Sequence, residues 1–303
     1  NYMKKYSDKE LNLNSITDDW LLTNPADILL HLINKEFSYD INEFDKPSLE
    51  QARNQHIDWI FAFTISEETD PVKFLEEYCQ NTMFCGKMKY DGNFSFVNIM
   101  KDINTSDKKI NVSDIINYEF TKSPKENLYL KVKVNYDYDE GTKAFRKATP
   151  QIYNGGIVPN NLEDYMSSYN VKDIDNYYLN FESKFIKDDD TANNLRNQLL
   201  SLYKNRHNII TLNLPHKYLD LECGDVVEFE NLIQGVTMFG LDYTQENVLN
   251  GQIITKYFIV EGVRKTVDSV QVKLFQHHQY DDNFIEQSYQ PDFLYNIDDV
   301  VFE

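Results

Sequence analysis

The acidic segment from Asn135 to Gly141 has the residue types of a calcium-binding loop. Asn135, Asp137 and Asp139 alternate along it and offer oxygen ligands at every second position. A calcium loop of this type needs its glycine at the sixth position and a bidentate glutamate at the twelfth. Here Gly141 comes one position late, and Arg146 stands where the closing glutamate is required. We therefore interpret the segment as a solvated strand end and predict no metal ligand in it.

Histidine and cysteine residues also occur in pairs, but their spacing does not suit a metal site. His277 and His278 are adjacent, and neighbouring residues on a strand point to opposite faces, so the two rings would not converge. Cys79 and Cys85 lack the two-residue spacing of a zinc knuckle, and Cys79 falls on the apolar stripe of a predicted helix. We interpret both as packing residues. With Cys223 they make an odd number, which suits assembly in a reducing cytoplasm.

Sequence motifs of catalysis are missing from the chain. It has no phosphate loop, nucleophile elbow, dinucleotide fingerprint or zincin helix. The 49 Asp and Glu residues guarantee chance carboxylate pairs in any fold, so no pair is singled out as acid and base. We predict that the chain is not an enzyme and name no catalytic residue and no cofactor. A glycoside hydrolase stays open as an alternative, which would require two carboxylates converging in a cleft.

The charge of the chain limits its partners. A formal net charge of -19 disfavours a surface that holds nucleic-acid phosphates, which needs clustered Lys and Arg. The same acidity favours solubility. With 41% hydrophobic residues and no apolar run of bilayer length, the chain is expected to have a sizeable core and no membrane segment.

Residues 1–110 are predicted to form an α/β lobe. Asn24 and Asp70 each precede a proline and are expected to cap helices. Ser48 stands three residues before a glutamine, the spacing of a capping box, and is expected to begin another helix. The Asp-Gly-Asn turn at 91–93 is predicted to join the two strands of a hairpin. The expected apolar faces are Ile28, Leu29, Leu32 and Ile33, then Leu49, Ala52, His56 and Trp59, then Val72, Leu75, Tyr78 and Cys79.

Residues 111–187 are predicted to hold one strand followed by an inserted arm. Apolar and polar residues alternate over 128–136, which is typical of a half-buried strand. The segment 140–187 is rich in Asn, Tyr, Asp and Ser and contains Gly155-Gly156, so we expect turns and irregular structure there.

Residues 188–280 are predicted to form a helix followed by a small antiparallel β-barrel or sandwich. The acidic triplet 188–190 is interpreted as a helix cap rather than a metal site, and Ala192, Leu195, Leu199, Leu202 and Arg206 are expected to share one face of the helix. Residues 281–303 are expected to be a polar tail or a connection. The predicted fold class is α+β, and the expected strands are 209–214, 226–229, 256–260 and 270–275.

The order of these elements resembles the central region of phage baseplate hub and tail-tip proteins. That group includes the host-specificity tip protein of lambda-like phages and the hubs of gene transfer agents. Family members similarly open a helix with Asn-Pro-Ala, place a helix before a hairpin with a turn glycine, and use a Gly-Asp turn before a barrel strand. The stretches that carry the resemblance are 24–33, 70–78, 86–96, 191–206, 209–215, 219–229, 257–260 and 270–274. The segment 140–187 matches nothing in the family.

The resemblance implies a homo-oligomer, a ring-shaped trimer in the virion that is assembled in the host cytoplasm. Such a ring would join the tail tube and distal tail proteins to the tip, spike or fibre proteins, and would let genomic DNA pass without binding it specifically. Acidic residues facing the lumen would then repel the DNA phosphates.

The aromatic content leaves a binding module open as a further alternative. The 21 Tyr and 19 Phe residues are expected either to pack the core or to form an aromatic face. In a carbohydrate- or receptor-binding module of a tail fibre, Trp20, Trp59 and several Tyr would lie in an exposed flat row, whereas a hub would bury most of them.

Overall fold

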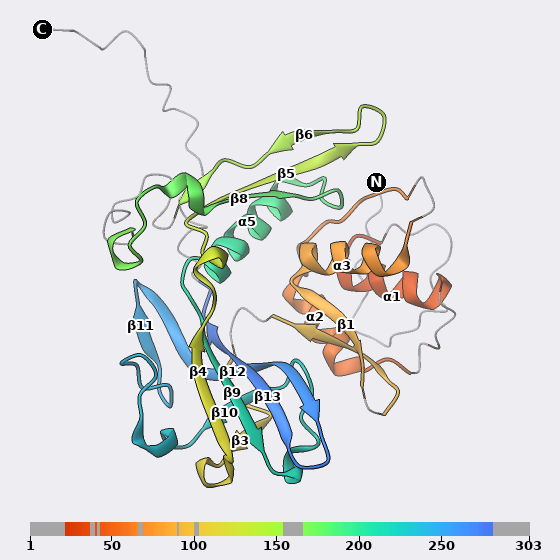
Figure 1. The fold of residues 1–303 in the computed structure, drawn as a ribbon. Helices are drawn as coiled ribbons and strands as arrows, with labels where there is room; N and C mark the ends of the chain where they lie inside the picture. Colours follow the sequence, from red (N-terminus) through yellow and green to blue (C-terminus); the bar gives the residue numbers. More distant parts are fainter. Residues whose placement is uncertain are drawn as a thin grey trace, which may run out of the picture.

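The computed structural model describes residues 22–36, 40, 43–65, 69–89, 91–99, 103–153 and 166–280. The fold is of the predicted α+β class. Figure 1 shows the N-terminal helices and a hairpin on the right, a four-stranded sheet with one helix at the top, and a seven-stranded sheet below. Within the described residues, no helix is long and apolar enough to span a bilayer. The predicted tail 281–303, Trp20 and Gly155-Gly156 lie outside the described residues.

The described residues of the N-terminal part form three helices: α1 (Pro25–Glu36), α2 (Lys46–Gln55) and α3 (Pro71–Thr82). Asn24 and Asp70 act as predicted, because each side chain accepts a hydrogen bond of 2.9 Å from the amide two residues further on. The predicted helix start at Ser48 was wrong. Asp45 caps α2, and its carboxylate accepts a hydrogen bond from the Ser48 amide at 3.1 Å. The proline that follows Asp45 by two residues fits the first turn, where its missing N–H is not needed.

The buried faces of these helices follow the predicted pattern in part. Leu29 and Ile33 of α1 are buried, but Leu30 is buried in place of Leu32, which is half-buried. In α3, Val72 is exposed, against the prediction. A fully buried leucine contributes roughly 2 kcal/mol to folding, so α1 is held mainly by this face rather than by its own helix propensity.

The predicted hairpin is formed by β1 (Phe84–Met88) and β2 (Phe94–Asn98), which pair in antiparallel register. Gly92 in the turn has a φ of 86°, a conformation that side chains disfavour. Gly86 faces the ring of Phe94 so closely that a Cβ built there would lie 2.1 Å from the ring. The aromatic ring therefore covers the glycine, and a larger residue at 86 would displace it.

The four-stranded sheet is built from β5 (Lys131–Asp139), β6 (Ala144–Ala148), β7 (Ile152–Tyr153) and β8 (Tyr178–Glu182). The predicted strand is confirmed from Lys131 onward, where Val132, Val134 and Tyr136 form its buried face. Leu128 and Leu130 are also buried, but they lie before the strand begins, so the predicted start at 128 was wrong. The expectation of irregular structure over 140–187 was wrong for three segments. β6 and β7 pair antiparallel with β5, and β8 pairs parallel with it, so the supposed arm supplies most of this sheet.

The helix α5 (Asp189–Tyr203) packs under this sheet (Figure 1). Asp188 is its cap, because the carboxylate accepts hydrogen bonds of 2.9 Å from both the amide and the hydroxyl of Thr191. The interpretation of the acidic triplet as a cap is therefore confirmed. On its predicted face, Ala192, Leu195, Leu199 and Leu202 are buried, but the helix ends at Tyr203, before Arg206.

The seven-stranded sheet is a curled half-barrel with the order β3-β10-β12-β13-β9-β4, and β11 pairs with β12. All pairings are antiparallel except β3 with β10, which is parallel, so the expectation of a purely antiparallel barrel needs this correction. Three of its strands, β3, β4 and β11, were not anticipated. The strands are β3 (Lys108–Ile110), β4 (Asn117–Lys122), β9 (Asn208–Leu214), β10 (Val226–Phe229), β11 (Asn247–Leu249), β12 (Gln252–Lys265) and β13 (Val270–His278).

Two large apolar cores hold the described chain together. The first joins α1, α2, α3 and the hairpin with β5 and α5, and the second fills the half-barrel. A small third cluster of Leu128, Leu130 and Val171 lies beside the four-stranded sheet. The helix α5 thus shares its core with the N-terminal helices. The division of the chain into 1–110, 111–187, 188–280 and 281–303 stays a prediction.

Candidate functional site

The acidic loop is closed by its own side chains. Asp139 accepts hydrogen bonds from the Gly141 amide at 3.1 Å and the Thr142 hydroxyl at 2.8 Å, and it pairs with Arg146 at 2.8 Å. The hydrogen bonds from Thr142 and Arg146 lower the pKa of Asp139 to about 2. Arg146 therefore supplies the positive charge that a calcium ion would bring. Across the described chain, no group of three or more His, Cys, Asp or Glu side chains is arranged to hold a metal ion.

The three cysteines differ in solvent exposure, and all three are free thiols. Cys79 is half-buried on α3, and burial raises the pKa of its thiol to about 11. Cys85 is exposed on β1, so its interpretation as a packing residue was wrong, and Cys223 is exposed as well. None of the three forms a disulfide.

The hairpin touches the half-barrel at the turn that contains Cys223. Lys87 forms an ion pair of 3.3 Å with Glu222 and donates to the Cys223 carbonyl. Gly224 has a φ of 90°, and a Cβ built on it would lie 2.7 Å from Cγ1 of Val97 on β2. The predicted Gly-Asp turn does precede a strand, β10, and its glycine also allows the close approach of the two parts.

His277 and His278 lie in a layer of buried polar side chains where the chain passes between the two cores. We call this set the junction layer: Asn205, His207, Asn208, Gln252, Thr255, Gln276, His277 and His278. The two histidines do not form a pair, as predicted. His278 stacks instead on His207, with ring centroids 3.8 Å apart, and His277 lies beside the Thr255 hydroxyl at 3.3 Å.

Hydrogen bonds run through the junction layer from α5 to β13. Asn205 donates to the Gln252 side chain at 2.8 Å, and Gln252 donates to the Ser201 carbonyl at 2.9 Å. Asn208 donates to the Gln276 side chain at 2.7 Å, which in turn donates to the Thr255 carbonyl at 2.8 Å. These hydrogen bonds of the Asn and Gln side chains favour one arrangement of the two cores.

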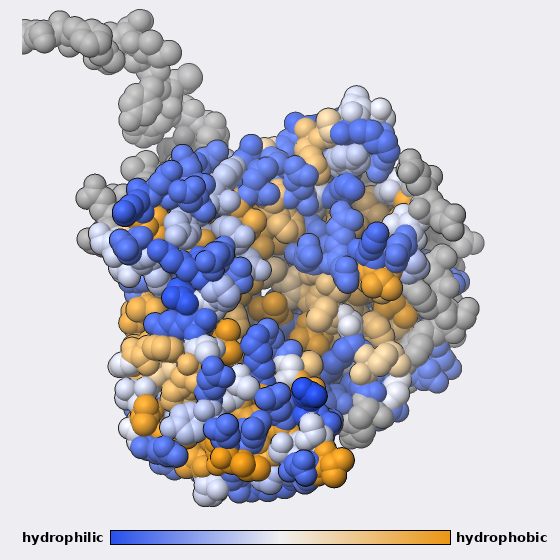
Figure 2. Space-filling view, viewed as in Figure 1, coloured by the Kyte–Doolittle hydropathy of each residue, from blue (hydrophilic) through white to orange (hydrophobic). Residues whose placement is uncertain are grey.

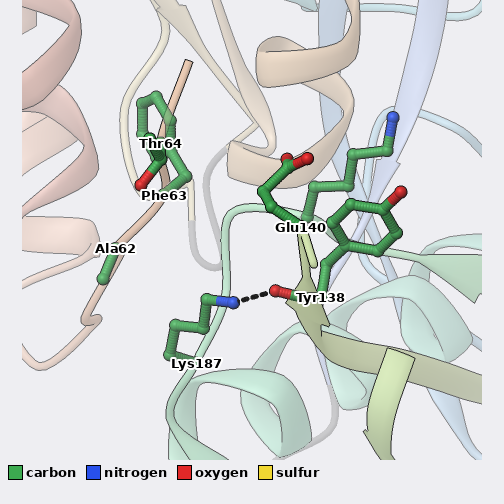
Figure 3. A pocket seen from close by; sticks show the side chains of 7 residues that line it. Ala62, Phe63, Thr64, Tyr138, Glu140 and Lys187 are labelled. Carbon is green, nitrogen blue, oxygen red and sulfur yellow. Dashed lines mark hydrogen bonds between the residues drawn. The ribbon is translucent and has the colours of Figure 1, made fainter. Parts of the chain in front are cut away.

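A pocket of about 260 Å³ lies between residues 62–64 and the end of β5. Figure 3 shows Phe63 and Thr64 on one side and Tyr138 and Glu140 on the other, with Lys187 bonded to the Tyr138 carbonyl oxygen. Its one carboxylate, Glu140, pairs with Lys143 at 2.8 Å. The pocket thus lacks the two converging carboxylates that glycoside hydrolysis requires, and the hydrolase alternative gains no support from it.

Exposed apolar side chains gather on one side of the half-barrel. Figure 2 shows hydrophobic residues along the left edge of the molecule, at the level of β11. Val248 of β11 and Ile253 of β12 are cross-strand partners there, and Val236 and Phe239 in the preceding loop are also exposed. Trp59 is buried, so it does not belong to an exposed aromatic row.

Sequence reasoning missed the junction layer and the pocket. The signal for the junction layer was the run Gln276-His277-His278, where strict alternation stops near the end of an otherwise alternating strand. The register shift between Ile254 and Phe258 on the neighbouring strand accompanies that change. The pocket had no such signal, because its residues come from three separated segments.

No protein-family model and no curated protein matches the sequence. A solved chain from the virion of a native gene transfer agent particle does match, over 82% of this chain, with a TM-score of 0.51 and 13% identity. The two chains share a fold. The match covers 46% of the virion chain, so this chain spans about half the length of that protein.

Two solved prophage proteins match with lower scores. The 43 kDa tail protein of prophage MuSo2 from Shewanella oneidensis has a TM-score of 0.40 and 8% identity over 72% of this chain and 58% of its own. Prophage tail protein gp18 from Listeria monocytogenes EGD-e has a TM-score of 0.37 and 10% identity over 75% of this chain and 64% of its own.

Proposed function

We propose that the chain is a structural protein of the tail of a phage or gene transfer agent particle, and more specifically a protomer of the baseplate hub or tail tip. The observation that carries the proposal is the fold shared with a gene transfer agent virion chain over 82% of this chain. The Gly224-Asp225 turn before β10 and the two Asx-Pro helix starts, which carried the resemblance in the sequence, support the same proposal.

In this role the chain forms a ring, most simply a trimer, between the tail tube with its distal tail proteins and the tip, spike or fibre proteins. The apolar side chains on β11 and β12 favour an assembled state, because exposed apolar patches of this kind are typical of interaction surfaces. The net charge of -19 suits a lumen that repels DNA and lets the genome pass without specific contacts. No catalytic step and no cofactor enter this role.

Light scattering of the purified full-length protein, alone and with the tail-tube and distal tail proteins, tests the proposal. We expect a closed ring alone or on addition of these partners. Val248→Asp, which places charge in the apolar pair with Ile253, is expected to weaken the ring. Val267→Asp is the matched control, because Val267 is more exposed and lies in the β12–β13 turn. A stable monomer that binds neither partner would contradict the proposal.

A further inference from the structure

Two histidine rings stack on each other inside the junction layer. The centroids of His207 and His278 are 3.8 Å apart and their planes are 22° from parallel. Phe275 also stacks on His207, at 4.1 Å. Both histidines are almost fully buried, with exposed fractions of 4% and 2%. A charge on either ring would therefore be held away from water.

The two rings differ in their hydrogen-bond surroundings. The nitrogens of His207 both face carbonyl oxygens, Nδ1 that of Gln276 at 3.0 Å and Nε2 that of Leu202 at 2.5 Å. Carbonyl oxygens only accept, and a neutral imidazole has a single N–H, so a protonated His207 would satisfy both contacts. Neither ring nitrogen of His278 has a hydrogen-bond partner among the described residues. A proton on His278 would find no acceptor there.

The other ionisable groups that face this pair are cations or can become cations. They are His277 on β13 and Lys204 at the end of α5. Burial, followed by the charges of His207, His277 and Lys204, lowers the pKa of His278 well below its usual value. Burial also lowers the pKa of His207, against the raising effect of its two carbonyl partners. Within the described chain, no Asp or Glu forms an ion pair with His207 or His278.

We propose that the His207–His278 stack is an acid-sensitive joint between the two cores. The first proton is accommodated on His207, between the Leu202 and Gln276 carbonyls. The second enters His278, where it has no acceptor and lies against a ring that is already charged. The repulsion is relieved when the end of β13 moves away from α5 and water reaches the ring. The joint is then open while each core keeps its own packing.

The direction of the pH dependence follows from proton binding. The open state has histidines near their ordinary pKa of about 6.5 and binds more protons than the closed state below that value. The closed joint is therefore fully favoured above about pH 6.5 and loses its advantage as the pH falls. Each extra proton bound by the open state changes the ratio of closed to open molecules by at most about tenfold per pH unit.

Amide hydrogen exchange of the full chain between about pH 7.5 and pH 5, corrected for the intrinsic effect of pH on exchange, tests the joint. We expect the backbone of 204–208 and 274–280 to lose about tenfold protection per pH unit below about pH 6.5. The strands β5 and β10, one in each core, are expected to keep their protection from exchange at the lower pH. Equal protection of the junction at both pH values would overturn the proposal.

Two variants distinguish an effect of the His207–His278 stack from a general loss of stability in acid. His278→Phe keeps a flat ring but removes the second proton site, so its junction is expected to stay protected in acid. His216→Phe is the matched control at an exposed histidine and should behave like the unaltered protein. Loss of protection in His278→Phe equal to that of the unaltered protein would overturn the joint. Should His278→Phe fail to fold, an NMR titration of the unaltered protein decides, and a His278 pKa at or above about 6.5 would refute it.

Discussion

At the scale of single residues, Gly224 shows how one small side chain lets two parts of the molecule meet. It combines a φ of 90° with an approach that leaves no room for a Cβ beside Val97. The neighbouring Lys87 side chain is half-buried, pairs with Glu222 and donates to the Cys223 carbonyl. Contact between the hairpin and the half-barrel therefore combines these polar contacts with the missing side chain at 224.

Gly224→Ala should consequently destabilise the protein more than an alanine at a comparable glycine. Gly240 has a φ of 85° and no atom within 4 Å of a built Cβ, so Gly240→Ala carries only the backbone strain, about 1–2 kcal/mol. We expect Gly224→Ala to lose a further 1–3 kcal/mol or so through the clash with Val97. Denaturant unfolding measures both values. Adding Val97→Ala should recover part of the extra loss, and equal losses for the two single variants would show that the close contact is absent.

At the scale of elements, strands with one buried face were predictable and strands placed by their neighbours were not. Val132, Val134 and Tyr136 alternate with polar residues because one face of β5 packs in the core shared with α5 while the other is half-exposed, so this strand could be predicted from its sequence. Leu128 and Leu130 precede the strand and pack in the small third cluster. β6 and β8 have little buried surface of their own, and the two free edges of β5 decide where they pair. β3 has three residues and is fixed by β10. Local patterns cannot encode such pairings.

The same contrast applies to the candidate site. The sequence correctly indicated that the adjacent histidines do not converge. It placed Arg146 at the position of the closing glutamate but did not predict that this arginine pairs with Asp139. It could not indicate that His207 would stack on His278, because the two residues are far apart in the sequence. The burial of their rings also depends on how α5 and β12 pack around them. The available signal for a buried polar layer was the polar run at the end of β13, where the alternation of the strand stops.

The start of α5 offers a direct check on how this helix is fixed. Asp188→Ala removes the side chain that accepts from the amide and hydroxyl of Thr191. We expect a loss of about 1 kcal/mol in the free energy of unfolding, the usual effect of deleting a helix cap. Asp190→Ala is the matched control, since that exposed side chain lies in the first turn without capping it. Calorimetry or denaturant unfolding measures both losses. A larger loss of unfolding free energy for Asp190→Ala than for Asp188→Ala would contradict the assigned cap.

At the scale of the whole molecule, two apolar cores meet through a polar junction and a hairpin contact. The relative position of the two cores is therefore set by specific contacts between them rather than by one continuous apolar core. The proposed ring at a tail end would need such defined relative positions within each protomer. The apolar pair of Val248 and Ile253 then lies on the outer side of the half-barrel, available to a neighbour.

The place of the chain in a particle tests the central claim most directly. Particles that carry the encoded chain with a small epitope tag would be imaged by cryo-electron microscopy with a gold-labelled antibody. We predict label at the distal end of the tail, and averaged density there into which the fold of Figure 1 fits as a ring around the tail axis. Label on the head, along the length of the tail, or absent from intact particles would contradict the account.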